Sequence, residues 1–299
     1  MRNRFSSTLL ELAKENPRIF LMCADLGFSV LEQFAERFPE RYLNVGIAEQ
    51  AMAGVAAGLA QSGFTVFIYS IANFPTMRCL EQIRNDVCYH RSDVKVVAVG
   101  SGLAYGNQGY THHAVEDVAV MSALPYMEVF SPADPEEVEA ATRALAVSRG
   151  PGYLRISRSG EPILSDLPIT DIRAPRVLAQ GEDVVSLATG AVADLAMQAK
   201  ALLGGSVGVV SLPCLKPFPS AEVLRLIGKA RRIVTLEEHI LRGGLYANLC
   251  ALLVQSGLRP SVVPLAMPEL SSHSIAGTRD ELLHDAGLSV EAVIQAVKG

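Results

Sequence analysis

Short apolar runs alternate with longer helical patterns along the whole chain, and this alternation limits the possible fold more than any other feature. The apolar runs have the length of buried strands and occupy residues 19–23, 65–69, 94–99, 127–130 and 152–156. The patterns between them have helical periodicity and occupy residues 6–14, 49–61, 78–89 and 135–147. Asp134 and Pro135 are residue types that favour the start of the last helix. Such β-α alternation predicts an α/β fold with a parallel sheet.

A change in composition divides the chain. Residues 166–180 carry two prolines and mixed polarity without a sustained period, which is typical of a linker. Beyond them, strand-length runs at 183–188, 207–211, 233–236 and 261–265 alternate with helical patterns at 191–203, 220–229 and 244–255. The sequence therefore predicts two doubly wound, mainly parallel-sheet domains, a larger one at 1–165 and a smaller one at 181–299.

Charge and cysteine content argue against several classes of protein. The net charge is -5 and no dense run of Lys and Arg occurs, so neither nucleic acid nor a membrane surface is an expected partner. No unbroken apolar stretch reaches the roughly 18 residues of a membrane span. The five cysteines are spread without a Cys-x-x-Cys pair, which favours a reducing, cytoplasmic setting. The low charged fraction of 19% favours burial of some surface against a second chain.

The helix expected at 49–61 carries small residues at helical spacing. Ala53 and Ala57 lie on one line of this helix, and Gly54 and Gly58 lie on the next. Two glycines inside a helix cost roughly 1 kcal/mol each relative to alanine, so a compensating contact is expected. Either a second subunit approaches this helix closely, or the helix packs tightly on its own sheet.

Glu49 opens this helix, directly after a strand expected at 42–45 and the turn at Gly46. Ligands of doubly wound proteins bind where strands end and helices begin. A glutamate in the first helical turn can also act only on the helix dipole. However, Val45 and Ile47 flank it and indicate burial, and a buried carboxylate is suited to hold or share a proton. We therefore favour a functional role for Glu49.

A second polar cluster follows the strand at 94–99, in the glycine-rich segment 100–113. Glycine lets the backbone approach a ligand closely. His112 and His113 stand near Glu116, but adjacent histidines point in different directions and no further ligand completes a metal site. A metal is the weaker alternative, and His112 is better suited to bind a polar substrate or carry its proton.

Arg158 follows the strand at 152–156, in a loop rich in Gly, Ser and Pro. This position suits the binding of an anion such as a phosphate. A solvated surface arginine is the alternative.

Several short motifs follow one another along the chain in a characteristic order. They are Ala24-Asp25-Leu26, Asn44-Val-Gly-Ile-Ala-Glu-Gln50, Glu81-Gln82-Ile83-Arg84-Asn85, Gly109-Tyr110-Thr111-His112, Ser131-Pro132-Ala133-Asp134, and Thr235-Leu-Glu-Glu-His239 with Gly243-Gly244-Leu245. Together they resemble the pyrimidine-binding and C-terminal domains of the transketolase family, which includes 1-deoxyxylulose-5-phosphate synthases. The resemblance covers essentially the whole chain. The family's Gly-Asp-Gly…Asn motif, which holds a diphosphate through Mg²⁺, is absent from this sequence.

The resemblance implies thiamine diphosphate as the cofactor and assigns residues to it. Glu49 matches the catalytic glutamate that hydrogen-bonds N1′ of the aminopyrimidine and sets its tautomer. Phe74 matches an aromatic side chain that stacks on the pyrimidine, and Ile71 and Asp25 fall beside the cofactor.

The resemblance also implies residues that bind substrate. His112 matches a histidine that contacts the sugar and takes part in catalysis. The other implied substrate-binding residues are Ser29, Arg158, Arg2 and Gln108. No residue of this chain is expected to bind a metal.

Three departures from the family pattern affect these residues. Ile71 and Met77 stand where typical transketolases have aromatic residues, Gly100 stands where they have a histidine, and Gln108 replaces an aspartate that binds a substrate hydroxyl. These departures leave the activation of the cofactor intact and imply a non-standard ketose donor or acceptor.

The resemblance implies the second half of a split transketolase, which transfers a two-carbon ketol unit from a ketose (phosphate) donor to an aldose. A separate N-terminal subunit would hold the diphosphate and Mg²⁺, in an α2β2 heterotetramer. Two alternatives are open. The chain is the β-subunit of another thiamine diphosphate enzyme, one that decarboxylates a 2-oxo acid and joins the product to a carbonyl compound, or it is a catalytically silent paralogue.

Overall fold

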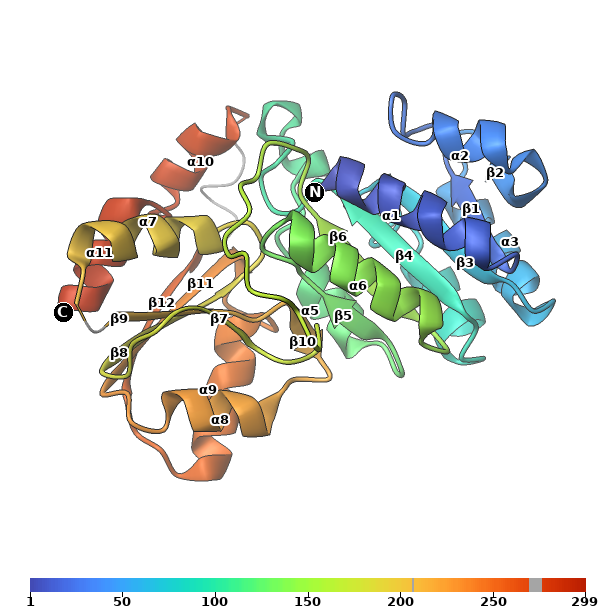
Figure 1. Cartoon of the computed structure of the whole chain (residues 1–299). Helices are drawn as coiled ribbons and strands as arrows, with labels where there is room; N and C mark the ends of the chain where they lie inside the picture. Colours follow the sequence, from blue (N-terminus) through green and yellow to red (C-terminus); the bar gives the residue numbers. More distant parts are fainter. Residues whose placement is uncertain (206, 269–275) are drawn as a thin grey trace.

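The computed structural model describes residues 1–205, 207–268 and 276–299, which form two sheets flanked by helices (Figure 1). The first sheet contains β1 (Ile19–Cys23), β2 (Tyr42–Asn44), β3 (Thr65–Ile71), β4 (Val94–Val99), β5 (Glu128–Phe130), β6 (Gly152–Ile156) and β10 (Cys214–Lys216). Their order is β10-β5-β6-β4-β3-β1-β2. Strands β1 to β6 pair in parallel, and β10 pairs antiparallel with β5.

The second sheet lies in the C-terminal part of the chain. It contains β7 (Arg176–Ala179), β8 (Val184–Thr189), β9 (Val207–Ser211), β11 (Arg232–Ile240) and β12 (Ser261–Met267). Their order is β12-β11-β8-β9-β7, parallel except where β7 pairs with β9. The expected α/β class with two mainly parallel sheets is therefore confirmed.

Helices cover both faces of each sheet, as a doubly wound fold requires. Those around the first sheet are α1 (Arg2–Glu15), α2 (Glu32–Arg37), α3 (Glu49–Gln61), α4 (Leu80–Gln82), α5 (Asp117–Ala123) and α6 (Pro135–Val147), with short turns η1 (Pro39–Arg41), η2 (Ile83–Cys88), η3 (Gly106–Gln108) and η4 (Tyr110–His112). Those around the second are α7 (Ala193–Leu203), α8 (Ser220–Ile227), α9 (Leu245–Ser256), α10 (Arg279–Asp285) and α11 (Val290–Lys298). None of the helices described is both long and apolar enough to cross a membrane.

Two elements differ from the sequence-based expectation. The single helix expected at 78–89 is instead the short α4 followed by η2, a π-helical segment that buries Ile83, Val87 and Cys88. The end of the segment expected as a linker forms β7, which pairs with β9 at the edge of the second sheet.

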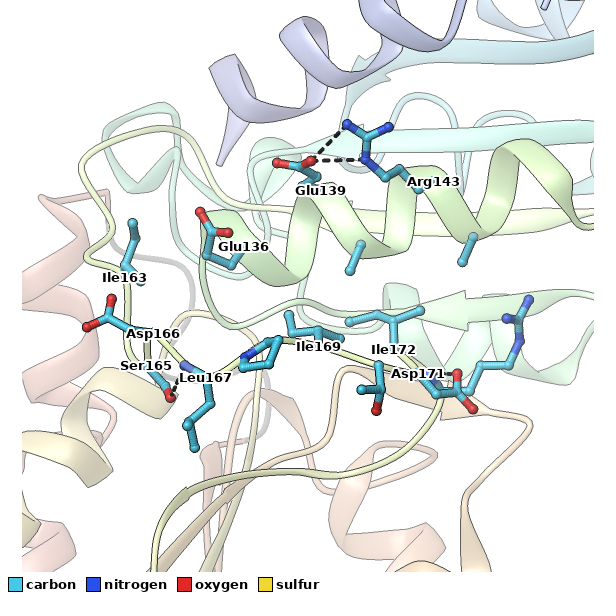
Figure 2. Close-up of a pocket in the computed structure, with 15 residues that line it drawn as sticks. Glu136, Glu139, Arg143, Ile163, Ser165, Asp166, Leu167, Ile169, Asp171 and Ile172 are labelled. Carbon is cyan, nitrogen blue, oxygen red and sulfur yellow. Dashed lines mark hydrogen bonds and ion pairs between the residues drawn. The ribbon is translucent and has the colours of Figure 1, made fainter.

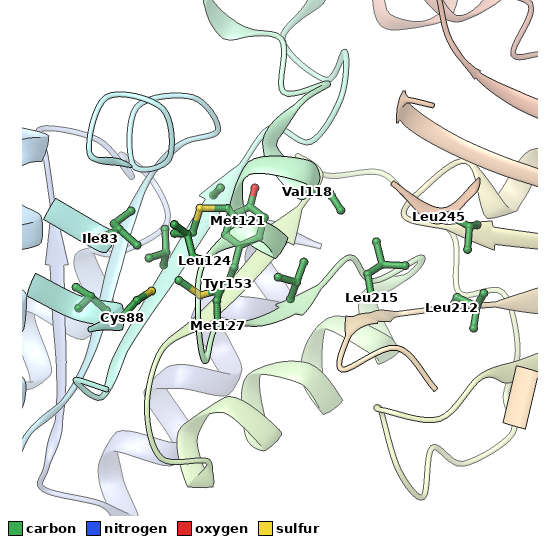
Figure 3. Packing of buried hydrophobic residues seen from close by; sticks show 14 of the residues in the cluster. Ile83, Cys88, Val118, Met121, Leu124, Met127, Tyr153, Leu212, Leu215 and Leu245 are labelled. Atoms are coloured by element: carbon green, nitrogen blue, oxygen red, sulfur yellow. The ribbon is translucent and has the colours of Figure 1, made fainter. Parts of the chain in front are cut away.

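The two halves share a hydrophobic core. One cluster joins α3 and one face of the first sheet to α8 and α9 beneath the second (Figures 1 and 3). Met121 and Met127 from the first half belong to the same cluster as Leu212, Leu215 and Leu245 from the second. A second cluster fills the α1 and α6 face of the first sheet, and a third fills the α7 and α11 face of the second. The shared cluster fixes the second half against the first.

The small residues of helix α3 differ in their surroundings. Ala53 and Ala57 are buried against the protein's own sheet. Gly54 and Gly58 are exposed, and a methyl group added to either would meet no atom within 4 Å. Packing within the chain therefore accounts for the alanines and not for the glycines.

A buried polar cluster also joins the halves. Asp134 caps α6 by accepting the Glu137 N–H at 2.8 Å, and it accepts Arg176 Nη1 at 2.9 Å. The Glu137 carboxylate accepts the Ala133 N–H at 2.7 Å and the Ser211 hydroxyl at 3.0 Å. Burial raises the pKa of Glu137 to about 7, although these donors and Arg176 oppose the rise.

We predict that Glu137 makes the stability of the fold depend on pH. Its folded-state pKa of about 7 exceeds the ordinary value of 4.5, so the folded chain binds this proton more tightly than the unfolded chain. The contribution is complete below the unfolded pKa and is lost as pH rises through the folded pKa, by about 3 kcal/mol in total. In Glu137→Gln, the unfolding free energy measured with urea should fall less between pH 5 and 8 than in the wild type. The surface variant Glu136→Gln is the control, and an unchanged slope in Glu137→Gln would contradict the assignment.

Candidate functional site

The candidate residues gather where neighbouring parallel strands end. Asp25 and Ser29 follow β1, and Glu49 follows β2. Phe74 follows β3, and Arg158 follows β6. The segment 100–113 leaves the end of β4, between them. Because parallel strands present their carboxyl ends at one edge, residues separated by more than a hundred positions reach the same part of the molecule.

Glu49 is buried, as its apolar neighbours predict, with 3% of its surface exposed. It is the first residue of α3, after the turn at Gly46, whose φ is +73°. Its Oε2 accepts Arg78 Nη1 at 2.8 Å, whereas its Oε1 accepts no hydrogen bond from the described residues. One oxygen of a buried carboxylate is therefore free to accept a ligand proton.

Arg78 connects Glu49 to an aromatic group. Its guanidinium carbon lies 4.4 Å from the centroid of the Phe74 ring. The Phe74 ring in turn meets His112 edge-on, with centroids 5.1 Å apart. Asn73 holds the two segments together by donating to the His113 carbonyl at 2.6 Å. Glu49, the Phe74 ring and the His112 imidazole thus form a row, in which Arg78 connects the first two.

His112 is half-buried at the end of η4. Burial lowers its pKa, and the neighbouring His113 lowers it further, so the ring is neutral at pH 7. Its Nδ1 lies 3.0 Å from the Thr111 hydroxyl, and no described residue hydrogen-bonds its Nε2. A neutral imidazole with one free nitrogen can donate to or accept from a substrate hydroxyl.

Tyr105 lies beside His112, with ring centroids 6.3 Å apart. Gly100 makes room for it: Gly100 has a φ of +95°, and a Cβ there would lie 2.2 Å from the Tyr105 ring. On another side of Tyr105, the Arg158 guanidinium carbon lies 4.9 Å from the ring centroid. Tyr105 therefore joins His112 to Arg158.

The second half of the chain holds this segment in place. The buried Glu238 accepts the Leu103 N–H at 2.7 Å and Arg279 Nη2 at 2.6 Å. A Cβ at Gly102 would lie 2.2 Å from Glu238 Cγ, so only glycine allows this approach. The Gly277 N–H also donates to the Gly106 carbonyl at 3.3 Å. The position of Tyr105 therefore depends on residues from the second half.

Arg2 and Arg158 lie next to each other. Neither pairs with a carboxylate among the described residues. The Arg2 N–H donates to the Arg158 carbonyl at 3.0 Å. Arg2 Nε is buried and has no hydrogen-bond partner in the described chain. Arg158 lines a cavity of about 550 Å³ together with Arg279, and the carboxylates of Glu161, Asp194 and Asp280 line it too. Arg2 Nε and Arg158 are the groups here that suit an anion, whereas the three carboxylates oppose one.

The remaining candidate residues have fewer contacts with Glu49, Phe74 and His112. Asp25 has a φ of +53°, and its N–H donates to Asn44, whose Oδ1 also accepts the Gly46 N–H next to the Glu49 turn. Ile71 lies half-buried at the end of β3. Ser29 and Gln108 are exposed, and among the described residues neither contacts Glu49, Phe74 or His112 through a side chain.

Two other features of the described residues bear on the site, namely their possible metal ligands and a cavity beside α6. Within the described ranges, no group of three His, Cys, Asp or Glu side chains could hold a metal ion. A cavity of about 660 Å³ lies between α6 and residues 163–173 (Figure 2). Arg143 pairs with Glu139 there, and the cavity contains no candidate residue.

Sequence reasoning did not identify Arg78, or Glu238 and Arg279, as part of this site. Arg78 stands in the same turn as Phe74, and a cation close to an expected acid was the available signal. Glu238 belongs to the Thr235–His239 motif, but neither it nor Arg279 carried a signal for this role, because the role comes from contacts between distant parts of the chain.

Fold and site together define an α/β protein of two mainly parallel sheets, with an acid and an aromatic ring at the carboxyl edge of the first. The family model for the transketolase pyrimidine-binding domain matches residues 1–161, and that for the transketolase C-terminal domain matches residues 174–293. The chain therefore belongs to the transketolase family.

Relatives of similar length support this assignment. A transketolase C-terminal section from Methanocaldococcus jannaschii is 34% identical, and the match covers 99% of this chain and 95% of the relative. One of the subunits of the apulose-4-phosphate transketolase from Phocaeicola vulgatus is 31% identical, with coverage of 98% and 94%. A solved split-gene transketolase, an inactive β4 tetramer, has a TM-score of 0.87 at 35% identity, with coverage of 99% and 96%. The chain thus resembles the C-terminal part of split transketolases.

We predict that Arg78 stabilises the chain by neutralising Glu49. In Arg78→Gln the buried carboxylate loses its cation, which should lower the unfolding free energy by about 1–2 kcal/mol, a value reduced by the partial exposure of Arg78. In a Glu49→Gln background the same change should cost much less, because no buried charge remains. Urea unfolding of the four chains measures this coupling. Equal costs in both backgrounds would contradict it.

Proposed function

We propose that this chain supplies one half of a thiamine diphosphate site, and that the complete enzyme transfers a two-carbon ketol unit from a ketose or ketose phosphate to an aldose. The observation that carries the proposal is the buried Glu49, which has one free oxygen and is joined through Arg78 to Phe74 at the carboxyl edge of the sheet. Membership of the transketolase family supports the reaction class. The similarity to part of an apulose-4-phosphate transketolase supports a ketose phosphate donor.

The residues present fit the aminopyrimidine of this cofactor. Glu49 Oε1 would accept a hydrogen bond from N1′ of the aminopyrimidine, and Phe74 would offer a face for stacking. Ile71 and Asp25 would border the ring. When bound, the cofactor would supply a carbanion as the nucleophile for the ketose carbonyl.

The part of Glu49 in the mechanism is to control a proton. A carboxylate at this position would hold a proton at N1′ and so would set the tautomer of the ring. Arg78 orients Glu49 before the cofactor arrives, because the ion pair at 2.8 Å offsets the cost of burying the carboxylate.

The part of His112 is to bind the reacting end of the sugar. As a neutral ring anchored at Nδ1, it would use Nε2 to bind a substrate hydroxyl and carry its proton. Arg158 and Arg2 would bind the phosphate at the other end of the substrate, and Ser29 and Gln108 would contact the sugar from the exposed rim.

A partner chain is the second part of the proposal. It would bring the diphosphate and Mg²⁺, for which no ligand set exists among the described residues. Large apolar side chains stand exposed around the strand ends: Phe28 is 72% exposed and Ile47 is 81% exposed. Such exposure is typical of a surface that another chain covers. The inactivity of the similar β4 tetramer supports the need for a different chain, and we propose an α2β2 assembly.

We also place the enzyme in the cytoplasm. All five cysteines, Cys23, Cys79, Cys88, Cys214 and Cys250, are free thiols, which suits a reducing compartment.

We predict that Glu49→Gln abolishes ketol transfer without unfolding the chain. An amide cannot hold the proton that the carboxylate holds, so turnover of the reconstituted complex should fall by about 100-fold or more. The assay follows transfer from xylulose 5-phosphate or apulose 4-phosphate to an aldose. Glu36→Gln, an exposed glutamate of α2, is the matched control.

Full activity in Glu49→Gln would overturn the proposal. Release of CO₂ from pyruvate by a complex that transfers nothing from ketoses would favour 2-oxo acid chemistry instead.

A further inference from the structure

Tyr105 occupies the space that a side chain at position 100 would fill. A Cβ built on Gly100 would lie 2.2 Å from both Cδ2 and Cε2 of the Tyr105 ring, so the two positions form one packing unit. The φ of +95° at Gly100 also disfavours any other residue there. The glycine at the end of β4 thus allows the tyrosine to enter the site.

Tyr105 stands between the two groups that face the ends of the proposed substrate. Its ring centroid lies 6.3 Å from that of His112 and 4.9 Å from the Arg158 guanidinium carbon. Arg158 Nη1 also donates to the Ala104 carbonyl at 3.5 Å, directly before the tyrosine. A molecule that reached from His112 to Arg158 would pass along Tyr105.

The Tyr105 hydroxyl makes no hydrogen bond to any of the described residues, although the side chain is half-buried. Tyr69 lies near it: burial raises the pKa of Tyr69, and Tyr105 raises it further. A tyrosine that served only as a wall could equally be phenylalanine, so the free hydroxyl points to a ligand.

Hydrogen bonds to the backbone directly before Tyr105 fix the position of this residue. Glu238 binds the Leu103 N–H, and Arg158 binds the Ala104 carbonyl, so the two residues before Tyr105 are fixed from different sides. A group fixed before the substrate binds loses little conformational entropy on binding.

We propose that Tyr105 is a specificity-determining residue, whose hydroxyl binds a hydroxyl of the sugar chain between the reacting carbonyl and the anionic group. This inference rests on the proposed ketol-transfer function. A site that binds a substrate hydroxyl discriminates strongly against substrates that lack it. Tyr105 therefore favours donors with a polyhydroxylated chain over short donors.

Tyr105→Phe tests this inference, because it removes the hydroxyl and keeps the ring that packs against Gly100. The reconstituted complex is assayed with two donors: xylulose 5-phosphate, which has a hydroxylated chain and a phosphate, and hydroxypyruvate, which carries the ketol unit on three carbons. For xylulose 5-phosphate, kcat/KM should fall about tenfold, mainly through KM. For hydroxypyruvate it should stay within about twofold.

Other outcomes separate the inference from the function on which it rests. Unchanged kcat/KM for both donors in Tyr105→Phe, or an equal loss for both, would overturn the role of Tyr105 and leave ketol transfer intact. A wild-type complex that uses neither donor would overturn both. As a second variant, Tyr105→Leu should show the same donor-selective loss together with a lower melting temperature, because it also removes the ring beside Gly100.

Discussion

The parallel order of β2, β1, β3, β4 and β6 is the constraint on which the rest of the structure depends. Each of these strands ends at the same edge of the first sheet, and each is followed by a segment that carries one candidate residue or more. Sharp turns directly after the strands are possible because Asp25, Gly46 and Gly100 adopt positive φ. The sheet thereby brings together residues that are far apart in the sequence, in a row that runs from Glu49 through Phe74 and His112 to Arg158.

The second half contributes to this row without supplying a residue that faces the proposed cofactor. Its shared core with the first half fixes the orientation of the two sheets, and Glu238 and Arg279 then hold the segment that carries Tyr105. The exposed apolar side chains of Phe28 and Ile47 follow β1 and β2 at the same edge of the sheet. The proposal that this edge forms half of a site agrees with the absence of the family's diphosphate-binding motif from the sequence.

The long buried strands and the helix at 49–61 could be predicted from the sequence because their apolar patterns are strong and local. The edge strands β7 and β10 could not, since their pairing with β9 and β5 supplies what their short sequences lack. The burial of Glu49 agrees with the expectation from its apolar neighbours, although one of them, Ile47, is itself 81% exposed. Its pairing with Arg78, 29 residues away, was not expected, and neither was the approach of Glu238 to Leu103 across 135 residues. Such contacts depend on the finished topology, which periodicity does not specify.

The central claim is that this chain holds half of a catalytic site and works only with a chain that holds the other half. Titrating it into a fixed amount of a diphosphate-binding transketolase N-terminal subunit, with thiamine diphosphate and Mg²⁺ present, tests this claim most directly. The account predicts no ketol transfer from either chain alone, and activity that rises and then saturates at an equimolar ratio. Ketol transfer by this chain alone, or none at any ratio with a partner that binds it, would contradict the account.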